Sequence, residues 1–216
     1  MSAADIVVIV DYGLGNLNSV SRAVRAAGGE PVISSDPQVV AEATKLILPG
    51  VGAFEAGMVG LRERDLIEPL NQQVSAGTPL LGLCLGMQLL FTESEEFGLH
   101  QGLGYIPGRV KLLQPTAPAT KIPHIGWNAL RPPGKTANWK GSVLKDVKPG
   151  EMVYFVHSFV PHVKDPVHIL AQTEYGGESF CSVTARANVT GTQFHPEKSG
   201  EVGQKILRQF LQQQKG

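Results

Sequence analysis

The chain has 216 residues, of which 19 are Lys or Arg and 19 are Asp or Glu, so its formal net charge is +0. A neutral chain offers no electrostatic reason to bind nucleic acid or an anionic membrane. Hydrophobic residues make up 42% of the chain and charged residues 18%, a balance that excludes a disordered protein. The length fits a single domain over residues 1–216.

Two features of the sequence concern the compartment in which the protein works. The longest apolar stretch, residues 80–91, is too short to span a bilayer, and the first residues carry Asp5 where a signal peptide needs basic residues. Only two cysteines occur, Cys84 and Cys181, so no disulfide framework is expected. We therefore expect a cytoplasmic protein.

The first half of the sequence alternates short apolar runs with segments of helical periodicity. In chain order these are a strand at 6–10, a helix at 17–27, a strand near 31–33, a helix start at 36–37, a strand at 46–48, a helical stretch to Ala76 and a strand at 79–83. The first run is β-branched throughout, which is typical of a parallel strand covered on both faces. This order predicts an α/β fold with a mostly parallel central sheet flanked by helices.

The second half has a different texture. Prolines separate short strand-like segments, such as the run Met152–Val156, which predicts antiparallel strands and loops within the same domain. In the last segment, residues 202–211, the apolar side chains share one face, which predicts an amphipathic helix.

The strongest chemical signal is the motif G-L-C-L-G over residues 82–86, at the end of a predicted strand. It has the form of a nucleophile elbow, in which flanking glycines permit a sharp turn that exposes the nucleophile. The run Met87–Phe91 after it has helical character, and a helix N-terminus favours a thiolate over a thiol. Cys84 is therefore the candidate nucleophile. The alternative is a buried structural cysteine, which is what we expect for Cys181.

A cysteine nucleophile needs a general base and a group that orients this base. The segment Q-F-H-P-E over residues 193–197 supplies His195 and Glu197, which would point to the same side of an extended backbone. Pro196 cannot join a strand ladder, so we expect this pair at the frayed end of a strand. With Cys84 these two residues make a candidate Cys–His–Glu triad.

A glycine-rich loop, L-P-G-V-G-A-F over residues 48–54, follows another predicted strand. Such a loop can present the N–H groups of Val51 and Gly52 to a developing oxyanion, beside the N–H of Leu85. The loop is a weak signal by itself, because Pro-Gly turns after strands are common. Together with the triad it completes a site for acyl transfer.

The sequence gives no comparable signal for a cofactor or a metal. A partial dinucleotide fingerprint begins at Gly13 but has Asn18 where its third glycine belongs. His157, His162 and His168 lack the spacing of metal ligands, so solvated or packed histidines are expected. We therefore expect no cofactor and no bound metal.

These segments together resemble the class I glutamine amidotransferases, which are marked by a Pro-Gly oxyanion loop, a G-x-C-x-G elbow and a His-x-Glu near the carboxyl end. Within that family the chain is similar to the glutaminase subunits of imidazole glycerol phosphate synthases. The segments that carry this similarity are DYGLGN at 11–16, PGVGAF at 49–54, GLCLGMQLLF at 82–91, IPHIGWN at 122–128, YFVHSF at 154–159 and HPEKS at 195–199. Phe159 stands where the family more often has Tyr, so a contact from a tyrosine hydroxyl would be absent.

The resemblance implies a flavodoxin-like fold of the class I glutamine amidotransferase type, and hydrolysis of glutamine to glutamate and ammonia. It implies a heterodimer with a (β/α)8-barrel cyclase, which would use the ammonia to form imidazole glycerol phosphate in histidine biosynthesis. Cys84 would attack the glutamine amide, His195 would transfer the proton, and Glu197 would orient the imidazole.

The resemblance also assigns two further sets of residues. The glutamine-binding set is Gly52, Gln88, Glu96, Ser158 and Phe159. The set expected at the mouth that faces the barrel is Asn16, Tyr154 and Lys198.

Three alternatives remain open at this point. The chain could be another triad glutaminase, serving nucleotide, anthranilate or pyridoxal phosphate synthesis. It could be a regulatory subunit that kept the fold without the chemistry, although every triad residue is present. It could also be a free-standing cysteine hydrolase, and an assay of glutamate release with and without a cyclase would separate the three.

Overall fold

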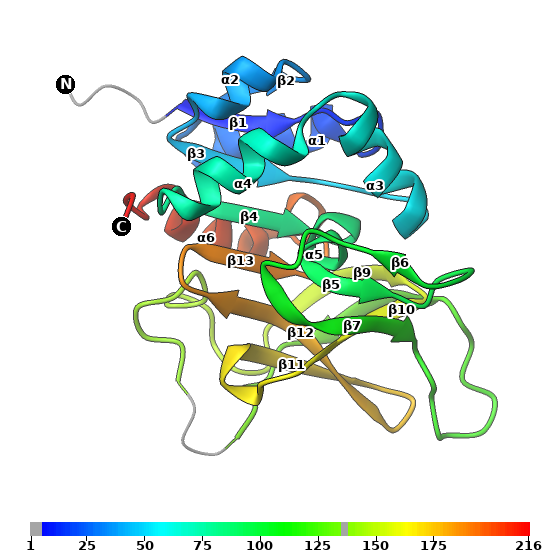
Figure 1. The fold of residues 1–216 in the computed structure, drawn as a ribbon. Helices are drawn as coiled ribbons and strands as arrows, with labels where there is room; N and C mark the ends of the chain where they lie inside the picture. The colour runs from blue at the N-terminus through cyan, green and yellow to red at the C-terminus, as the bar shows by residue number, and fades with distance from the viewer. Residues whose placement is uncertain (1–5, 135–137) are drawn as a thin grey trace.

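The computed structural model describes residues 6–134 and 138–216, and its central layer is a seven-stranded sheet (Figure 1). In spatial order the strands are β11 (Ile169–Tyr175), β12 (Glu178–Arg186), β13 (Val189–Thr192), β4 (Leu80–Leu83), β3 (Lys45–Leu48), β1 (Ile6–Val10) and β2 (Glu30–Ser34). The strands from β13 to β2 pair in parallel, whereas β11 and β12 extend the sheet with antiparallel pairs. The predicted α/β class with a mostly parallel sheet is confirmed.

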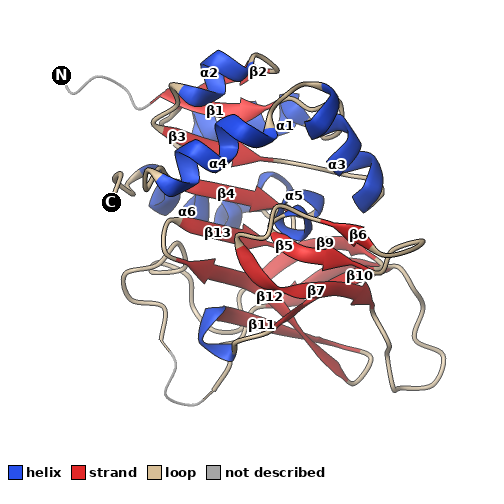
Figure 2. Ribbon diagram, viewed as in Figure 1, coloured by secondary structure: helices blue, strands red, loops and turns tan. Residues whose placement is uncertain are grey.

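Helices cover both faces of the parallel part of the sheet (Figure 2). They are α1 (Leu17–Ala26), α2 (Pro37–Ala41), α3 (Phe54–Glu63), α4 (Ile67–Ser75), α5 (Leu85–Leu89) and α6 (Gly200–Leu211). Because successive side chains of a strand point to opposite faces, Val7 and Ile9 pack with α1 and α6, while Val8 and Val10 pack with α3 and α4. Burial on both faces explains why β1 is apolar at nearly every position.

Residues from Phe91 onward add two smaller sheets beside the antiparallel end of the central one. A four-stranded sheet has the order β10-β7-β5-β6, with strands β10 (Phe159–Val163), β7 (Ile106–Leu112), β5 (Phe91–Ser94) and β6 (His100–Gln101). A two-stranded sheet joins β8 (His124–Ala129) to β9 (Met152–His157). Two 3-10 turns complete the chain, η1 (Pro166–His168) and η2 (Pro196–Lys198). The pairs β10–β7, β5–β6 and β8–β9 are antiparallel, which confirms the expectation of antiparallel strands, whereas β5 and β7 pair in parallel.

Two of the predicted helical segments were wrong in extent. The stretch that reaches Ala76 is divided into α3 and α4, because Asp65 takes a left-handed conformation (φ 53°) and the Leu66 N–H donates to the Leu61 carbonyl at 3.0 Å. These are the marks of a Schellman C-cap, which ends a helix. The run that was expected to be helical through Phe91 ends at Leu89, and Phe91 begins β5.

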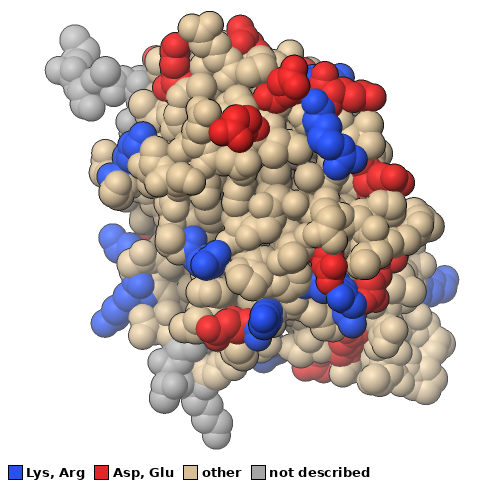
Figure 3. Space-filling model, viewed as in Figure 1, with Lys and Arg blue, Asp and Glu red and all other residues tan. Residues whose placement is uncertain are grey.

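The exposed surface agrees with the neutral composition. In Figure 3 basic and acidic side chains both occur on the visible face, and neither sign covers it. Within the described residues no helix is both long and apolar enough to cross a membrane. The targeting expectation drawn from Asp5 lies outside the described residues.

Candidate active site

Cys84 lies directly after β4 and forms the cap of α5, at the carboxyl edge of the parallel sheet. Its backbone has φ 52° and ψ −108°, a conformation that a residue with a side chain rarely adopts. Such strain is kept in folded proteins mainly where function requires it. Cys84 is also 6% exposed, so the thiol lies in a nearly closed environment.

The two glycines of the elbow are required for a reason different from the one expected. Neither Gly82 nor Gly86 has a positive φ, so the strained turn is made by Cys84 itself. A methyl group on Gly86 would overlap the Leu48 carbonyl, and one on Gly82 would lie 2.7 Å from the Gly86 oxygen. The glycines therefore let α5 approach β3 and β4 closely, which holds Cys84 in place.

The dipole of the following helix contributes less than was expected. Helix α5 has only five residues, so few aligned peptide dipoles act on the Cys84 sulfur. The sulfur has direct neighbours instead: the thiol donates to the Val156 carbonyl at 3.9 Å, and Gln193 Nε2 donates to the sulfur at 3.8 Å. Gln193 is fully buried, and sequence reasoning missed it.

His195 and Glu197 form a buried hydrogen-bonded pair. His195 Nδ1 lies 2.8 Å from Glu197 Oε1, and the two side chains are 3% and 2% exposed. The expected frayed strand is wrong, because β13 ends at Thr192 and Glu197 lies in the η2 turn. The turn, rather than an extended backbone, brings the carboxylate behind the imidazole.

Strand β9 fixes the position of this pair. The His195 N–H donates to the Tyr154 carbonyl at 3.1 Å. The Ser199 hydroxyl donates to the His195 carbonyl at 2.6 Å and accepts from the Tyr154 N–H at 3.0 Å. Ser199 therefore links β9 to the turn that carries Glu197, a role that its position after the H-P-E segment did not reveal.

The neighbours of His195 determine its protonation. Burial by itself would lower the pKa of His195, but the Cys84 sulfur and the Glu197 carboxylate outweigh burial and raise this pKa to about 10. Since a carboxylate only accepts, Nδ1 carries the proton that is shared with Glu197. Nε2 is buried and has no hydrogen-bond partner, so it is the nitrogen left for a reacting group.

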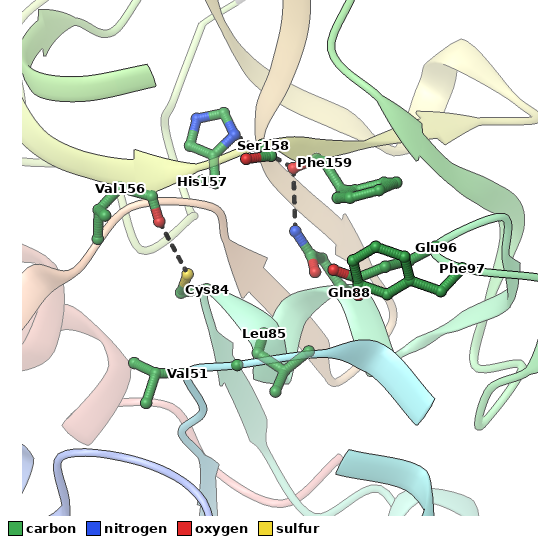
Figure 4. Close-up of a pocket in the computed structure, with 11 residues that line it drawn as sticks. Val51, Cys84, Leu85, Gln88, Glu96, Phe97, Val156, His157, Ser158 and Phe159 are labelled. Carbon is green, nitrogen blue, oxygen red and sulfur yellow. Dashed lines mark hydrogen bonds between the residues drawn. The ribbon is translucent and has the colours of Figure 1, made fainter. Parts of the chain in front are cut away.

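A cavity of about 330 Å³ opens at Cys84 (Figure 4). It is lined by Val51, Gly52, Cys84, Leu85, Gln88, Glu96, Phe97, Val156, His157, Ser158 and Phe159. The structure therefore brings the expected oxyanion residues and the whole expected glutamine-binding set to one pocket. Three lining residues, Phe97, Val156 and His157, were not among the expected ones.

A hydrogen bond from Tyr12 holds the start of the glycine-rich loop. The buried Tyr12 hydroxyl donates to the Pro49 carbonyl at 2.5 Å, and a methyl group on Gly50 would overlap this hydroxyl. Gly52 has φ 104°, in the left-handed region, whereas the Val51 side chain is 41% exposed at the mouth of the pocket.

Two polar side chains line the other side of the pocket. Gln88 Nε2 donates to the Phe159 carbonyl at 3.0 Å and to Gln193 Oε1 at 3.1 Å, which leaves the Gln88 oxygen available to a ligand. Glu96 Oε2 accepts from the Phe54 N–H at 2.6 Å, and burial raises the pKa of this carboxyl. A half-buried carboxylate of this kind suits an ammonium group.

Two of the three expected partner residues lie together. The Lys198 ammonium is 6.0 Å from the centre of the Tyr154 ring, and Trp127 packs edge-on against the same ring. Asn16 is exposed and caps α1, which contacts the η2 turn that carries Lys198.

Cys181 has the buried position that was expected for it. Cys181 is buried and donates to the Val183 carbonyl, and burial raises the pKa of its thiol. Across residues 6–134 and 138–216, no cluster of three or more His, Cys, Asp or Glu side chains is arranged to hold a metal ion.

Comparison with known proteins assigns the chain to a family. The family model described as "Glutamine amidotransferase class-I" matches residues 8–214. "Imidazole glycerol phosphate synthase subunit HisH 1" of Legionella pneumophila (strain Lens) is 46% identical over 209 residues, which cover 95% of this chain and 98% of that protein. The HisH subunit of Aquifex aeolicus is 45% identical over 207 residues, 94% of each chain.

Solved structures agree on the fold. A crystal structure of a glutamine amidotransferase superposes with a TM-score of 0.71 at 18% identity, over 95% of this chain and 96% of that one. PurLQS from Thermotoga maritima gives 0.69 at 21% identity, over 97% and 98%. By sequence and by fold, this chain belongs to the class-I glutamine amidotransferase family, in the branch of the HisH subunits of imidazole glycerol phosphate synthase.

Proposed function

We propose that this chain is the glutaminase subunit of an imidazole glycerol phosphate synthase and hydrolyses glutamine to glutamate and ammonia in histidine biosynthesis. The observation that carries the proposal is the strained Cys84 at a cavity of about 330 Å³, beside the buried His195–Glu197 pair. The 44–46% identity to HisH subunits, over nearly their whole length, selects this branch among triad glutaminases. We propose a single domain over residues 1–216.

The reaction begins with attack of the Cys84 sulfur on the side-chain amide carbon of glutamine. The thiol proton passes to His195 Nε2 before the attack, which forms the imidazolium that the raised pKa of His195 favours. This imidazolium then protonates the amide nitrogen as the C–N bond breaks. Ammonia leaves, and a thioester joins Cys84 to the glutamyl group. His195 next takes a proton from water, which attacks the thioester and releases glutamate and the free thiol. Glu197 holds the imidazole in the required tautomer throughout.

Both tetrahedral intermediates carry a negative oxygen that needs N–H donors. The N–H groups of Leu85, directly after the nucleophile, and of Val51 or Gly52 in the glycine-rich loop are the candidates. This assignment is supported by the position of Leu85, Val51 and Gly52, which all line the cavity at Cys84. One donor of this kind is worth about 10²–10³-fold in kcat.

Glutamine binding is assigned to the polar wall opposite this loop. The Glu96 carboxylate would pair with the substrate ammonium, and the free Gln88 oxygen and the Ser158–Phe159 backbone would bind the rest of the amino acid end. The ring of Phe159, which meets Phe97 edge-on at 6.4 Å, supplies apolar contact at the mouth of the pocket.

The proposed partner is a (β/α)8-barrel cyclase, which joins the ammonia to a phosphorylated, ribulosyl-bearing aminoimidazole carboxamide. The products would be imidazole glycerol phosphate and an aminoimidazole carboxamide ribotide. The docking face includes Asn16, Tyr154 and Lys198. Its support is that Lys198 and Glu197 share the η2 turn, so a partner contact there is one residue from the triad.

The test is to titrate the cyclase subunit into this chain and to follow glutamate release and imidazole glycerol phosphate together. Stoichiometric coupling of the two products is expected in the presence of the cyclase substrate. A regulatory subunit would release no glutamate. A free-standing hydrolase would release it without any response to the cyclase, and either result would reject the proposal.

A further inference from the structure

Two buried histidines outside the triad lie behind the glutamine pocket. His124 and His157 are opposite each other in the antiparallel pair β8–β9, and their exposed fractions are 2% and 6%. His157 lines the cavity, whereas His124 is not among the lining residues and stacks against the rings of Phe155 and Tyr175. His124 Nδ1 lies 3.1 Å from His157 Nε2.

A single carbonyl fixes the protons of both rings. His157 Nδ1 lies 3.1 Å from the Phe159 carbonyl, which can only accept, so Nδ1 of His157 carries a proton. In the neutral ring Nε2 is then an acceptor, and it must receive its hydrogen bond from His124 Nδ1. Nε2 of His124 is left as an acceptor, and Asn128 Nδ2 approaches it at 3.5 Å.

The surroundings favour two neutral rings. Three aromatic residues, Phe155, Tyr175 and Phe180, pack against His124, and Phe155 and Phe180 also contact His157. Burial lowers the pKa of His124 to about 4, and burial together with the neighbouring His124 lowers the pKa of His157 to about 3. Both imidazoles therefore act as fixed hydrogen-bond groups rather than as charges at neutral pH.

The series of donors ends at the Phe159 carbonyl, which also positions Gln88. The Phe159 carbonyl accepts from His157 and also from Gln88, whose second N–H donates to Gln193. Figure 4 shows His157, Phe159 and Gln88 together on one wall of the pocket. If the Phe159 carbonyl moved, Gln88 would lose one of the two acceptors that together determine which of its amide atoms faces the ligand.

We propose that His124 and His157 are positioning residues: as a directed pair of neutral imidazoles they hold the Phe159 carbonyl, and through it Gln88, in the orientation that binds glutamine. This inference rests on the proposed glutaminase function and adds to it a reason for two histidines that take no part in proton transfer. It assigns them an effect on glutamine affinity rather than on the chemical step.

The test compares two substitutions that separate hydrogen bonding from packing. His157→Phe keeps a ring but removes the N–H, whereas His157→Asn is smaller but keeps an N–H near the position of Nδ1. In the complex with cyclase, we expect His157→Phe to raise the KM for glutamine about tenfold or more, with a smaller change in kcat, and His157→Asn to restore much of the loss. If the residue served packing alone, His157→Asn would be the more impaired variant.

Phe155→Leu is the matched control, because it removes a ring that stacks on His124 and leaves every hydrogen bond of the pair. It should lower thermal stability and change the KM less than twofold. Ammonia-dependent synthesis by the complex should stay the same in all three variants, because the cyclase chemistry lies on the other chain. A KM for His157→Phe within twofold of wild type would overturn the inference.

A measurement on the unaltered complex covers the case in which a variant fails to fold. Nitrogen-15 NMR of the imidazoles should show both rings as Nδ1–H tautomers at neutral pH, and an Nε2–H tautomer at His157 would overturn the proposed direction. The two proposals also fail in different ways. A wild-type complex that releases no glutamate rejects the function and this inference with it, whereas an active complex with unchanged variants rejects only the inference.

Discussion

The molecule contains two groups of buried histidines whose pKa values are shifted in opposite directions. His195 is paired with Glu197, and the carboxylate and the Cys84 sulfur raise its pKa to about 10 in spite of burial. His124 and His157 are enclosed by aromatic rings and have each other as partners, and their pKa values fall to about 4 and about 3. All three side chains are almost fully buried.

The difference shows that burial alone does not set the charge of a histidine. A buried imidazole becomes charged when a carboxylate shares its proton, and stays neutral when its partners are a carbonyl and another imidazole. The charged centre suits proton transfer, and the neutral pair suits fixed hydrogen bonding.

The largest effect is expected when the nucleophile beside the charged centre is removed. Cys84→Ala should lower glutamine-dependent synthesis on the order of 10⁶-fold and leave ammonia-dependent synthesis intact. An electrophilic glutamine analogue should label Cys84 and spare Cys181, which is buried with a raised thiol pKa. Peptide mass mapping of the label decides the assignment, and modification at Cys181 would contradict it.

Removing the Glu197 carboxylate should lower the pKa of His195 toward the values of the neutral His124–His157 pair. Glu197→Gln leaves a hydrogen-bonding amide behind His195 but takes away the charge that raises its pKa. We expect kcat to fall about 10³–10⁴-fold, as for loss of the orienting carboxylate in other triads. The expected fall in the pKa of His195 can be followed by NMR titration of its imidazole. A variant that kept more than a tenth of wild-type kcat would show that Glu197 is not needed.

The two centres should give opposite contributions to stability as pH changes. His124 and His157 have folded pKa values below the unfolded value, so the stability they provide is present above about pH 6.5 and is lost as pH falls toward 4 and 3. His195 has a raised folded pKa, so its contribution is full below about pH 6.5 and is lost as pH rises toward 10.

Urea unfolding of His124→Phe/His157→Phe between pH 7 and 4.5 tests the first of these contributions. The decline in unfolding free energy toward acid pH should become shallower, by at most about 1.4 kcal/mol per pH unit for each histidine removed. Glu197→Gln is the contrasting variant. It should change how the unfolding free energy depends on pH above pH 6.5, and it should leave the decline between pH 7 and 4.5 similar to that of wild type. If the unfolding free energy of the double variant declined toward acid pH as steeply as that of wild type, groups other than these two histidines would be responsible for the decline.

The smallest effect on the isolated chain is expected at the rim of the charged centre. Lys198 is exposed and lies over the Tyr154 ring, so Lys198→Ala should change the free energy of unfolding by less than about 1 kcal/mol. It should nevertheless weaken cyclase binding or cyclase-stimulated glutamate release several-fold, because a partly desolvated interface charge is sensitive to loss. Titration of cyclase measures both quantities, and Lys164→Ala is the control for an exposed lysine away from η2. Identical curves for wild type and Lys198→Ala would place the docking face elsewhere.

Much of the site could be predicted from local sequence. The strand-to-turn motif around Cys84 and the His195–Glu197 spacing indicate a candidate nucleophile, base and orienting acid, because each motif is short and chemically specific. The order of apolar runs predicted the parallel sheet, since strands buried on both faces have a distinctive composition. The absence of a glycine turn distinguished Cys181 from Cys84 in the sequence, and the structure places Cys181 in the core with the Val183 carbonyl as its partner.

Other features were decided only by tertiary structure. Gly86 is needed because β3 brings the Leu48 carbonyl against it, and Glu197 reaches His195 through a 3-10 turn that the Pro196 pattern did not distinguish from a strand end. Gln193 becomes a functional candidate only when it meets Cys84, which is 109 positions away in the sequence.

The neutral histidine pair illustrates the same limit most directly. His124 and His157 are 33 residues apart, and nothing in either local segment indicates that one imidazole donates to the other. The antiparallel register of β8 and β9 places them opposite each other, and the Phe159 carbonyl then fixes the direction of every proton in the pair. Local sequence determined which residues could do chemistry. Long-range pairing decided which of them carry charge, because the pKa of a buried group depends on the partners that the fold brings to it.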